Sequence, residues 1–180
     1  EVDYFPESVA NLTLCTPDQG EMDLRLQGPT TVEVYIGPNG EAADTDGDGR
    51  DQVVTRMTQM DLTGNHPMLG AVQLRLRDPS RHPNRASGGE IEELLPNNTP
   101  GILDIAPFAA SGLADSFFDV YVEVEFDSPT GGRVVWHNHD PKRMRTVIDH
   151  KPPGPGRTYE DPQVIPLFDE NEEPTGYSIC

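Results

Sequence analysis

The stretch Asp119-Val-Tyr-Val-Glu-Val-Glu-Phe126 alternates polar and apolar residues from end to end. Successive side chains of a β-strand point to opposite faces, so the apolar residues at even-numbered positions would share one face of the strand. Such alternation is the pattern of a half-buried strand. It predicts a sheet with one face against a core and the other toward solvent.

The same period of two recurs at residues 22–27, 32–36 and 72–77. Further strands are expected at 11–15, 52–62, 133–136, 162–168 and 175–179. Strands buried on one side are typical of antiparallel sheets packed face to face, whereas parallel sheets show continuous apolar runs with helices between them. Only residues 108–114 and 144–148 look capable of forming helix. The sequence therefore predicts an all-β fold, an antiparallel β-sandwich of about eight to eleven strands with long loops, immunoglobulin-like or jelly-roll-like.

A single domain over residues 1–180 is expected, because a chain of this length suits one well-buried core. Residues 1–17 could extend from it as an N-terminal arm. The net charge of −18 opposes binding to nucleic acid and to anionic membrane surfaces. No stretch approaches the roughly 20 apolar residues of a membrane span. The chain begins with Glu1 instead of Met, as expected of a processed protein or an excised domain.

The segment Asp44-Thr-Asp-Gly-Asp-Gly-Arg-Asp-Gln52 places carboxylates at loop positions 1, 3 and 5 and a glycine at position 6. Ca²⁺ takes six to eight oxygen ligands, so it needs several short carboxylates on a tightly curved backbone. The sequence predicts a calcium site formed by Asp44, Asp46, Asp48 and the main-chain carbonyl of Arg50. Asp51 or Gln52 could complete the set, either directly or through water. An acidic turn without an ion is the alternative.

This segment resembles the Asp-x-Asp-x-Asp-Gly calcium loops of dockerins, thrombospondin type 3 repeats and FG-GAP-type repeats. The resemblance covers about nine residues and implies a structural ion. Position 12 of the loop is Thr55, where an EF-hand has a bidentate glutamate, and no flanking helix is expected. The loop is therefore expected to stabilise the fold and not to act as a calcium sensor.

A second metal site is suggested by Trp136-His-Asn-His-Asp140. On a strand, His137 and His139 would project from one face and could chelate Zn²⁺, Cu²⁺ or Fe²⁺, with His150 or Asp140 as a third ligand. Solvent-exposed loop histidines are the alternative.

The two cysteines, Cys15 and Cys180, lie near opposite ends of the chain. A disulfide between them would close a loop that removes roughly 5 kcal/mol of unfolded-state entropy as an upper figure; two separate thiols are the alternative. Two sequons could carry N-glycans, at Asn11 and Asn97. Together with the calcium loop, these features favour a secreted or cell-surface protein.

No nucleophile elbow or phosphate-binding glycine loop is present in the sequence, so an enzyme is not expected. The pattern favours a calcium-stabilised extracellular structural or adhesive module, able to form the repeating subunit of a surface fibre or layer. Its partners would be further copies or other surface proteins; the basic residues Lys142, Arg143 and Arg145 would either dock on another copy or pair with local acids.

Two other functions remain open from the sequence. One is a calcium-dependent carbohydrate-binding module, in which aromatic side chains would stack on sugar rings: Tyr35, Tyr121, Trp136 or Tyr159. The other is a metalloenzyme centred on His137 and His139.

Overall fold

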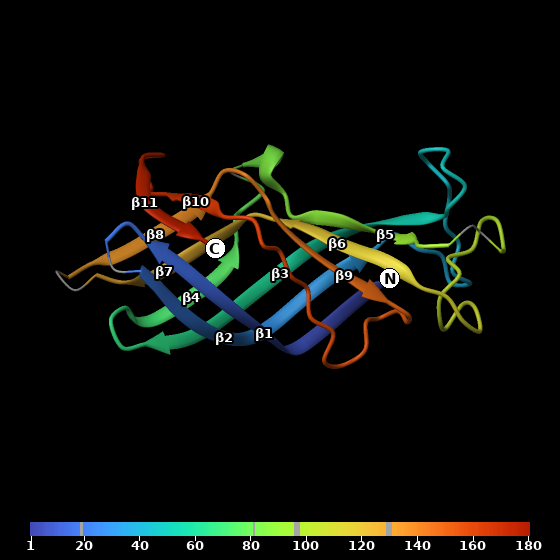
Figure 1. The fold of residues 1–180 in the computed structure, drawn as a ribbon, viewed down its shortest axis with the longest axis horizontal. Coiled ribbons are helices and arrows are strands. Elements are labelled where there is room, and N and C mark those ends of the chain that lie inside the picture. The colour runs from blue at the N-terminus through green and yellow to red at the C-terminus, as the bar shows by residue number, and fades with distance from the viewer. Residues whose placement is uncertain (19, 81, 96–97, 129–130) are drawn as a thin grey trace.

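The computed structural model describes residues 1–18, 20–80, 82–95, 98–128 and 131–180, and this part of the chain is almost entirely antiparallel β-structure (Figure 1). Its eleven strands are β1 (Val2–Thr16), β2 (Gly20–Val34), β3 (Gln52–His66), β4 (Gly70–Leu76), β5 (Gly88–Glu93), β6 (Ala114–Val120), β7 (Val122–Asp127), β8 (Arg133–Asn138), β9 (Lys142–Ile148), β10 (Ile165–Phe168) and β11 (Pro174–Ile179). A single 3₁₀ turn, Pro83–Arg85, lies among these described residues. The predicted all-β, antiparallel, sandwich-like fold is confirmed.

Three strands of 15 residues each, β1, β2 and β3, run along the length of the molecule and belong to both of its halves (Figure 1). In one half the strand order is β2-β1-β11-β10-β8-β7-β4-β3, and pairing of β2 with β3 closes the circle. In the other half the order continues from β3 through β5 and β6 to β9. The long strands therefore run through both halves, and buried apolar residues of the described chain form one hydrophobic core.

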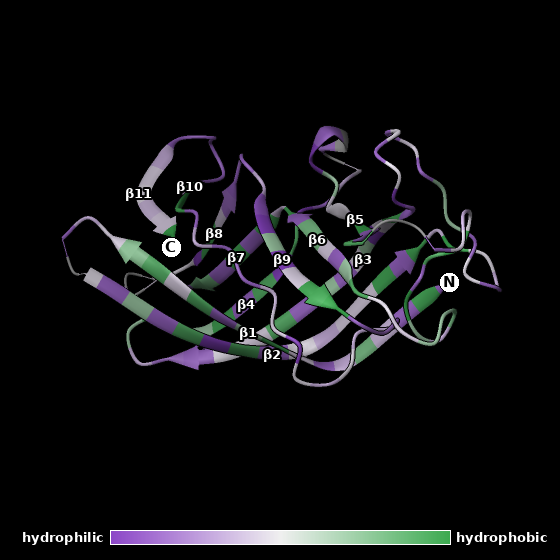
Figure 2. Cartoon of the chain, turned by 45° about the vertical axis from the view of Figure 1, so that its right-hand side comes forward, coloured by the Kyte–Doolittle hydropathy of each residue, from purple (hydrophilic) through white to green (hydrophobic). Residues whose placement is uncertain are grey.

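The apolar residues of the alternating strands form much of the core, and Figure 2 shows the alternation along the strands. On β2, Met22, Leu24 and Leu26 are buried while the residues between them are exposed. On β7 the apolar face is buried as expected, yet Glu125 on the other face is also buried. Arg75 lies over it, with its Nη2 3.0 Å from the Glu125 carboxylate. The Arg75 guanidinium therefore covers part of the face of β7 that the alternation predicted to be exposed to solvent.

The Asp119–Phe126 stretch that predicts one strand forms the end of one strand and the start of another. β6 pairs with β5 and β9, whereas β7 pairs with β4 and β8. The chain thus passes from one half to the other at Tyr121, which lies between the two strands. The Ser87 hydroxyl hydrogen-bonds both backbone groups of Tyr121. Its Oγ accepts from the Tyr121 N–H at 2.9 Å and donates to the Tyr121 carbonyl at 3.3 Å.

The other side of this crossing is held by the side chain of Asn138, which is completely buried. Its Oδ1 accepts from the Val122 N–H at 2.7 Å, and its Nδ2 donates to the Val120 carbonyl at 2.9 Å. The same Nδ2 donates to the Asp140 carbonyl at 2.8 Å. The amide therefore hydrogen-bonds the backbone of Val120 and Val122 where the chain passes from one half of the sheet to the other.

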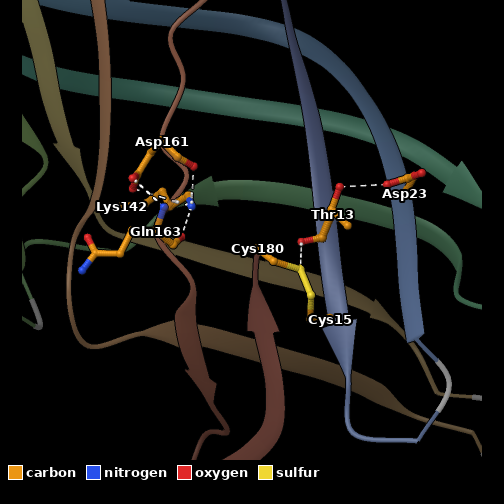
Figure 3. Close-up of a disulfide and its surroundings, with 7 residues drawn as sticks. All are labelled: Thr13, Cys15, Asp23, Lys142, Asp161, Gln163 and Cys180. Atoms are coloured by element: carbon orange, nitrogen blue, oxygen red, sulfur yellow. Dashed lines mark hydrogen bonds and ion pairs between the residues drawn. A yellow bond between two sulfur atoms is a disulfide. The ribbon is translucent and has the colours of Figure 1, made fainter.

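Residues 1–17 do not form a separate arm, because β1 pairs with β2 from Val2 to Thr16. The disulfide is formed: Cys15 on β1 bonds to Cys180 just after β11, with the two Cα atoms 5.9 Å apart (Figure 3). The predicted bond thus ties the C-terminal end of the described chain to its first strand.

The segment 149–164 lies between β9 and β1 (Figure 1). Arg145 and Glu160 form a backbone bridge on its β9 side. On the β1 side, the buried Lys151 ammonium pairs with Glu1 and Asp3. Lys142 holds the same segment near its end, with Nζ 3.0 Å from the Asp161 carbonyl (Figure 3).

Both short helices expected from the sequence are absent from this described part of the chain. Residues 144–148 belong to β9, where pairing with β6 overrides a weak local helix preference. Residues 108–113 form turns and bends before β6. None of the described helical structure has the length and hydropathy needed to cross a membrane.

Replacing Asn138 with Ala should lower the free energy of unfolding by about 3 kcal/mol, because buried backbone groups at Val120 and Val122 would lose their partners. Urea denaturation at neutral pH measures this loss. The exposed Asn65 of β3 offers a control, and Asn65→Ala should change stability by less than about 0.5 kcal/mol. Equal losses in the two variants would contradict the role assigned to the buried amide.

Candidate functional site

The loop between β2 and β3 brings Asp44, Asp46 and Asp48 together as predicted. Each offers one carboxylate oxygen, and the three oxygens lie within 4.8 Å of one another on an exposed surface. Backbone hydrogen bonds between Ala43 and Gln52, at 3.1 and 3.2 Å, close the base of the loop. Three convergent carboxylates of this kind could hold a metal ion.

The loop owes its curvature to backbone groups that turn toward Asp44. Its carboxylate accepts from the N–H groups of Gly47 at 2.7 Å, Asp48 at 3.2 Å and Gly49 at 3.0 Å. Gly47 and Gly49 have φ values of 82° and 90°, which glycine adopts at little cost. The local sequence is thus sufficient to bend the chain around the three acids.

The other predicted ligands have different roles in this structure. The Arg50 guanidinium donates to Asp48 with Nε 2.7 Å from Oδ2, and this hydrogen bond holds the pKa of the Asp48 carboxyl below its usual value. Asp51 is buried and accepts from the Gly101 N–H at 2.6 Å. The side chain of Gln52 donates to the Thr45 hydroxyl at 2.5 Å. The structure therefore brings the three aspartates together and uses these neighbours to secure the loop.

His137 and His139 form the second predicted site, at the end of β8. Because Asn138 between them points into the core, both imidazoles point to the opposite side, and their Nε2 atoms lie 3.2 Å apart. His137 is buried and His139 is partly exposed. The ring of Phe168 stacks on His139 with the centroids 3.6 Å apart.

The third member of this group is Glu172, in place of the expected His150 or Asp140. Its Oε2 lies 2.6 Å from His139 Nε2, and its Oε1 lies 3.5 Å from His137 Nε2. His150 lies elsewhere, with Nδ1 2.8 Å from the Pro152 carbonyl. The three converging ligand atoms come from the end of β8 and from the turn between β10 and β11.

Two arginines flank Glu172. Arg77 is buried and donates from Nη2 to Glu172 Oε1 at 2.9 Å, while Arg85 Nη1 lies 3.6 Å from Oε2. Burial raises the pKa of the Glu172 carboxyl, but the charges of His137 and Arg77 and the arginine hydrogen bond outweigh it and lower this pKa to about 2. Burial lowers the pKa of both histidines, and the charge of Arg77 for His137 and of Arg85 for His139 lowers it further.

No local sequence signal identified Glu172. It lies in a tight turn whose first residue, Asp169, accepts from the N–H groups of Asn171 at 2.8 Å and Glu173 at 3.0 Å. Glu172 has a φ of 65°, a left-handed conformation that glycine or asparagine adopts more readily. The position of Glu172 is set by the geometry of this turn, and that geometry depends on the pairing of β10 with β11. The sequence alone therefore does not reveal this ligand.

The remaining predicted residues are placed as follows. The basic cluster is paired locally: Arg143 Nη2 lies 2.6 Å from Asp119, and Arg145 Nε lies 2.6 Å from Asp115. Asn11 is exposed on β1, whereas Asn97 lies outside the described residues.

Two of the four candidate sugar-stacking rings are partly buried and pack against other aromatic rings. Trp136 lies against Tyr177 with ring centroids 4.4 Å apart, and Tyr159 against Phe118 at 5.5 Å. An open groove of about 450 Å³ runs beside β3 and β4, and none of its described lining residues is aromatic. Tyr35 remains well exposed.

No protein-family model matches the sequence. No curated protein matches it either. A similar solved structure is that of DynF, from the dynemicin biosynthesis pathway of Micromonospora chersina, with a TM-score of 0.59 and 20% sequence identity over 99% of this chain and 81% of DynF. The chain is therefore an all-β protein with a β-rich fold of the DynF type.

The lowered pKa of Glu172 predicts a contribution to acid sensitivity. A carboxyl whose pKa is lower in the folded protein stabilises the fold above its ordinary pKa, and this stabilisation is lost as the pH falls through the folded-state pKa. Stability should therefore decrease from about pH 4.5 toward pH 2, modestly because half of the side chain is exposed.

Denaturant titrations at several pH values, without divalent ions, measure this contribution. Glu172→Gln should make the decrease with falling pH shallower. Glu170, exposed in the same turn, offers a control, since Glu170→Gln should follow the wild-type profile. Superimposable profiles for Glu172→Gln and wild type would show that the effect is not present.

Proposed function

We propose that this chain is a calcium-stabilised extracellular structural module that associates with further copies of itself or with other surface proteins. The observation that carries the proposal is the convergence of Asp44, Asp46 and Asp48 on one exposed loop. In this proposal the main-chain carbonyl of Arg50 and water complete an oxygen shell suited to Ca²⁺.

An ion at this loop would stabilise a whole end of the molecule. The loop base is joined to the segment that precedes β6, because Asp51 accepts from the Gly101 N–H and Glu41 pairs with Ile102. Both segments lie at the same end of the molecule (Figure 1). Calcium would therefore hold loops that carry few strand contacts of their own.

The disulfide supports an extracellular location. Such bonds persist in oxidising compartments and are rare where thiols are kept reduced. Cys15 and Cys180 are separated by 165 residues, so the bond constrains the unfolded chain over nearly its whole length. A chain stabilised both by a long-range disulfide and by an ion suits the conditions outside the cell.

The outer edge of β1 supports association with a partner. Within the described residues, this edge pairs with a strand only at Leu14 and Cys15, and the segment 149–164 meets its start through Lys151. Val2, Tyr4 and Val9 on the same strand are exposed. An unpaired strand edge with exposed apolar side chains can pair with a strand of another molecule.

Removing calcium should lower the melting temperature. An ion at 100 times its dissociation constant stabilises the folded state by about 2.7 kcal/mol, which corresponds to roughly 5–10 °C for a domain of this size. Differential scanning calorimetry with 1 mM calcium or with a chelator measures the shift. Unchanged melting on chelation would refute the assignment.

Matched variants locate the ion. Asp46→Asn should abolish the calcium-dependent shift, whereas Asp18→Asn in the exposed turn after β1 should preserve it. Arg50→Gln should raise calcium affinity, because it removes a cation that competes for Asp48 and keeps the main-chain carbonyl. A full calcium response in Asp46→Asn would place the ion elsewhere.

Association is tested by light scattering at increasing protein concentration with calcium present. The wild type should form dimers or larger species. Tyr4→Lys, which replaces an exposed ring on β1 with a charge, should shift the population toward monomer. A wild type that stays monomeric at high concentration would overturn the association part of the proposal and leave the calcium assignment intact.

A further inference from the structure

We propose that His137, His139 and Glu172 form a binding site for a transition-metal ion of the Zn²⁺ class, separate from the aspartate loop. Two imidazole nitrogens and one carboxylate converge from segments that are far apart in sequence. Imidazole favours zinc, copper, nickel or iron, whereas Ca²⁺ prefers an all-oxygen shell. The two sites would therefore select different ions.

The distances between the ligand atoms fit a single small ion. With bonds of about 2.0–2.1 Å, the ligand atoms of a tetrahedral Zn²⁺ site lie about 3.3 Å apart. The two Nε2 atoms are 3.2 Å apart, and one ligand atom from each of the three residues lies within 4.8 Å of the others. His137 Nε2 is 3.5 Å from Glu172 Oε1. The other oxygen, Oε2, is 2.6 Å from His139 Nε2, which is a hydrogen-bond distance. Binding would lengthen it by less than 1 Å.

Surrounding groups hold the three ligands in place. Asn138 fixes the end of β8 through its buried amide, so that the residues on either side of it point to the same side. Phe168 stacks on His139. Arg77 donates to Glu172 Oε1 at 2.9 Å and to the Asn138 carbonyl at 3.2 Å, which orients the carboxylate with Oε2 toward His139. Such outer contacts are typical of metal sites.

The site is asymmetric with respect to solvent. His137 is buried, while 24% of the His139 side chain and 48% of the Glu172 side chain are exposed. An ion can therefore enter from the surface, and three protein ligands leave a fourth position for water or an exogenous ligand. The charges of Arg77 and Arg85 oppose a cation, so the affinity should be lower than that of a closed four-ligand zinc site.

Isothermal titration of the full chain with ZnSO₄ tests the proposal. The protein is first stripped with a chelator, and 1 mM calcium is present to occupy the aspartate loop. One Zn²⁺ should bind per chain, and His139→Ala should weaken binding more than tenfold. His150→Ala and Asp46→Asn should leave zinc affinity unchanged, because neither residue belongs to the group.

Glu172→Gly separates metal binding from folding. Glycine suits the left-handed backbone of this position, so the turn should be retained while the carboxylate is lost. Circular dichroism should match the wild type, and zinc affinity should fall more than tenfold. Co²⁺ provides a second readout, since a tetrahedral complex gives visible d–d bands that this variant should lack. No zinc binding by the wild type, or wild-type affinity in both Glu172→Gly and His139→Ala, would overturn the proposal.

Discussion

The buried amide of Asn138 is the interaction on which the arrangement of this protein depends. The chain passes from one half of the sheet to the other between β6 and β7, and a strand that ends inside a protein leaves backbone donors and acceptors without partners. Asn138 supplies a carbonyl to Val122 and an amino group to Val120, so the break is satisfied from a third strand. Because this side chain must point into the core, the histidines on either side of it lie together on the opposite side of the chain. One structural requirement thus also creates the second candidate metal site.

An acidic chain of net charge −18 must also position its carboxylates without leaving them unsatisfied. Backbone N–H groups satisfy several of these carboxylates. Glu93 is buried and accepts from the N–H groups of Asp104 at 2.6 Å and Asp51 at 3.2 Å. Burial, opposed by these hydrogen bonds, raises the pKa of its carboxyl. These contacts connect the base of the aspartate loop to the segment before β6.

The two candidate ion sites differ in how they are built. Asp44, Asp46 and Asp48 are close in sequence and are brought together by a turn in which the hydrogen bonds to the Asp44 carboxylate are local. His137 and Glu172 are brought together by the pairing of β8 with β10 and of β10 with β11. The first site depends on the conformation of a few residues, whereas the second depends on the correct order of strands in the sheet.

The sequence by itself determined the class of fold, most of the strands and the aspartate loop, because alternation and loop spacing are short-range properties of the chain. The tertiary structure decided that the alternating stretch at 119–126 divides at Tyr121, that residues 144–148 form a strand, and that Glu172 joins the two histidines. A uniform alternation cannot show which sheet each half of a stretch will join. Likewise, no local pattern reveals a ligand whose position is set by long-range strand pairing.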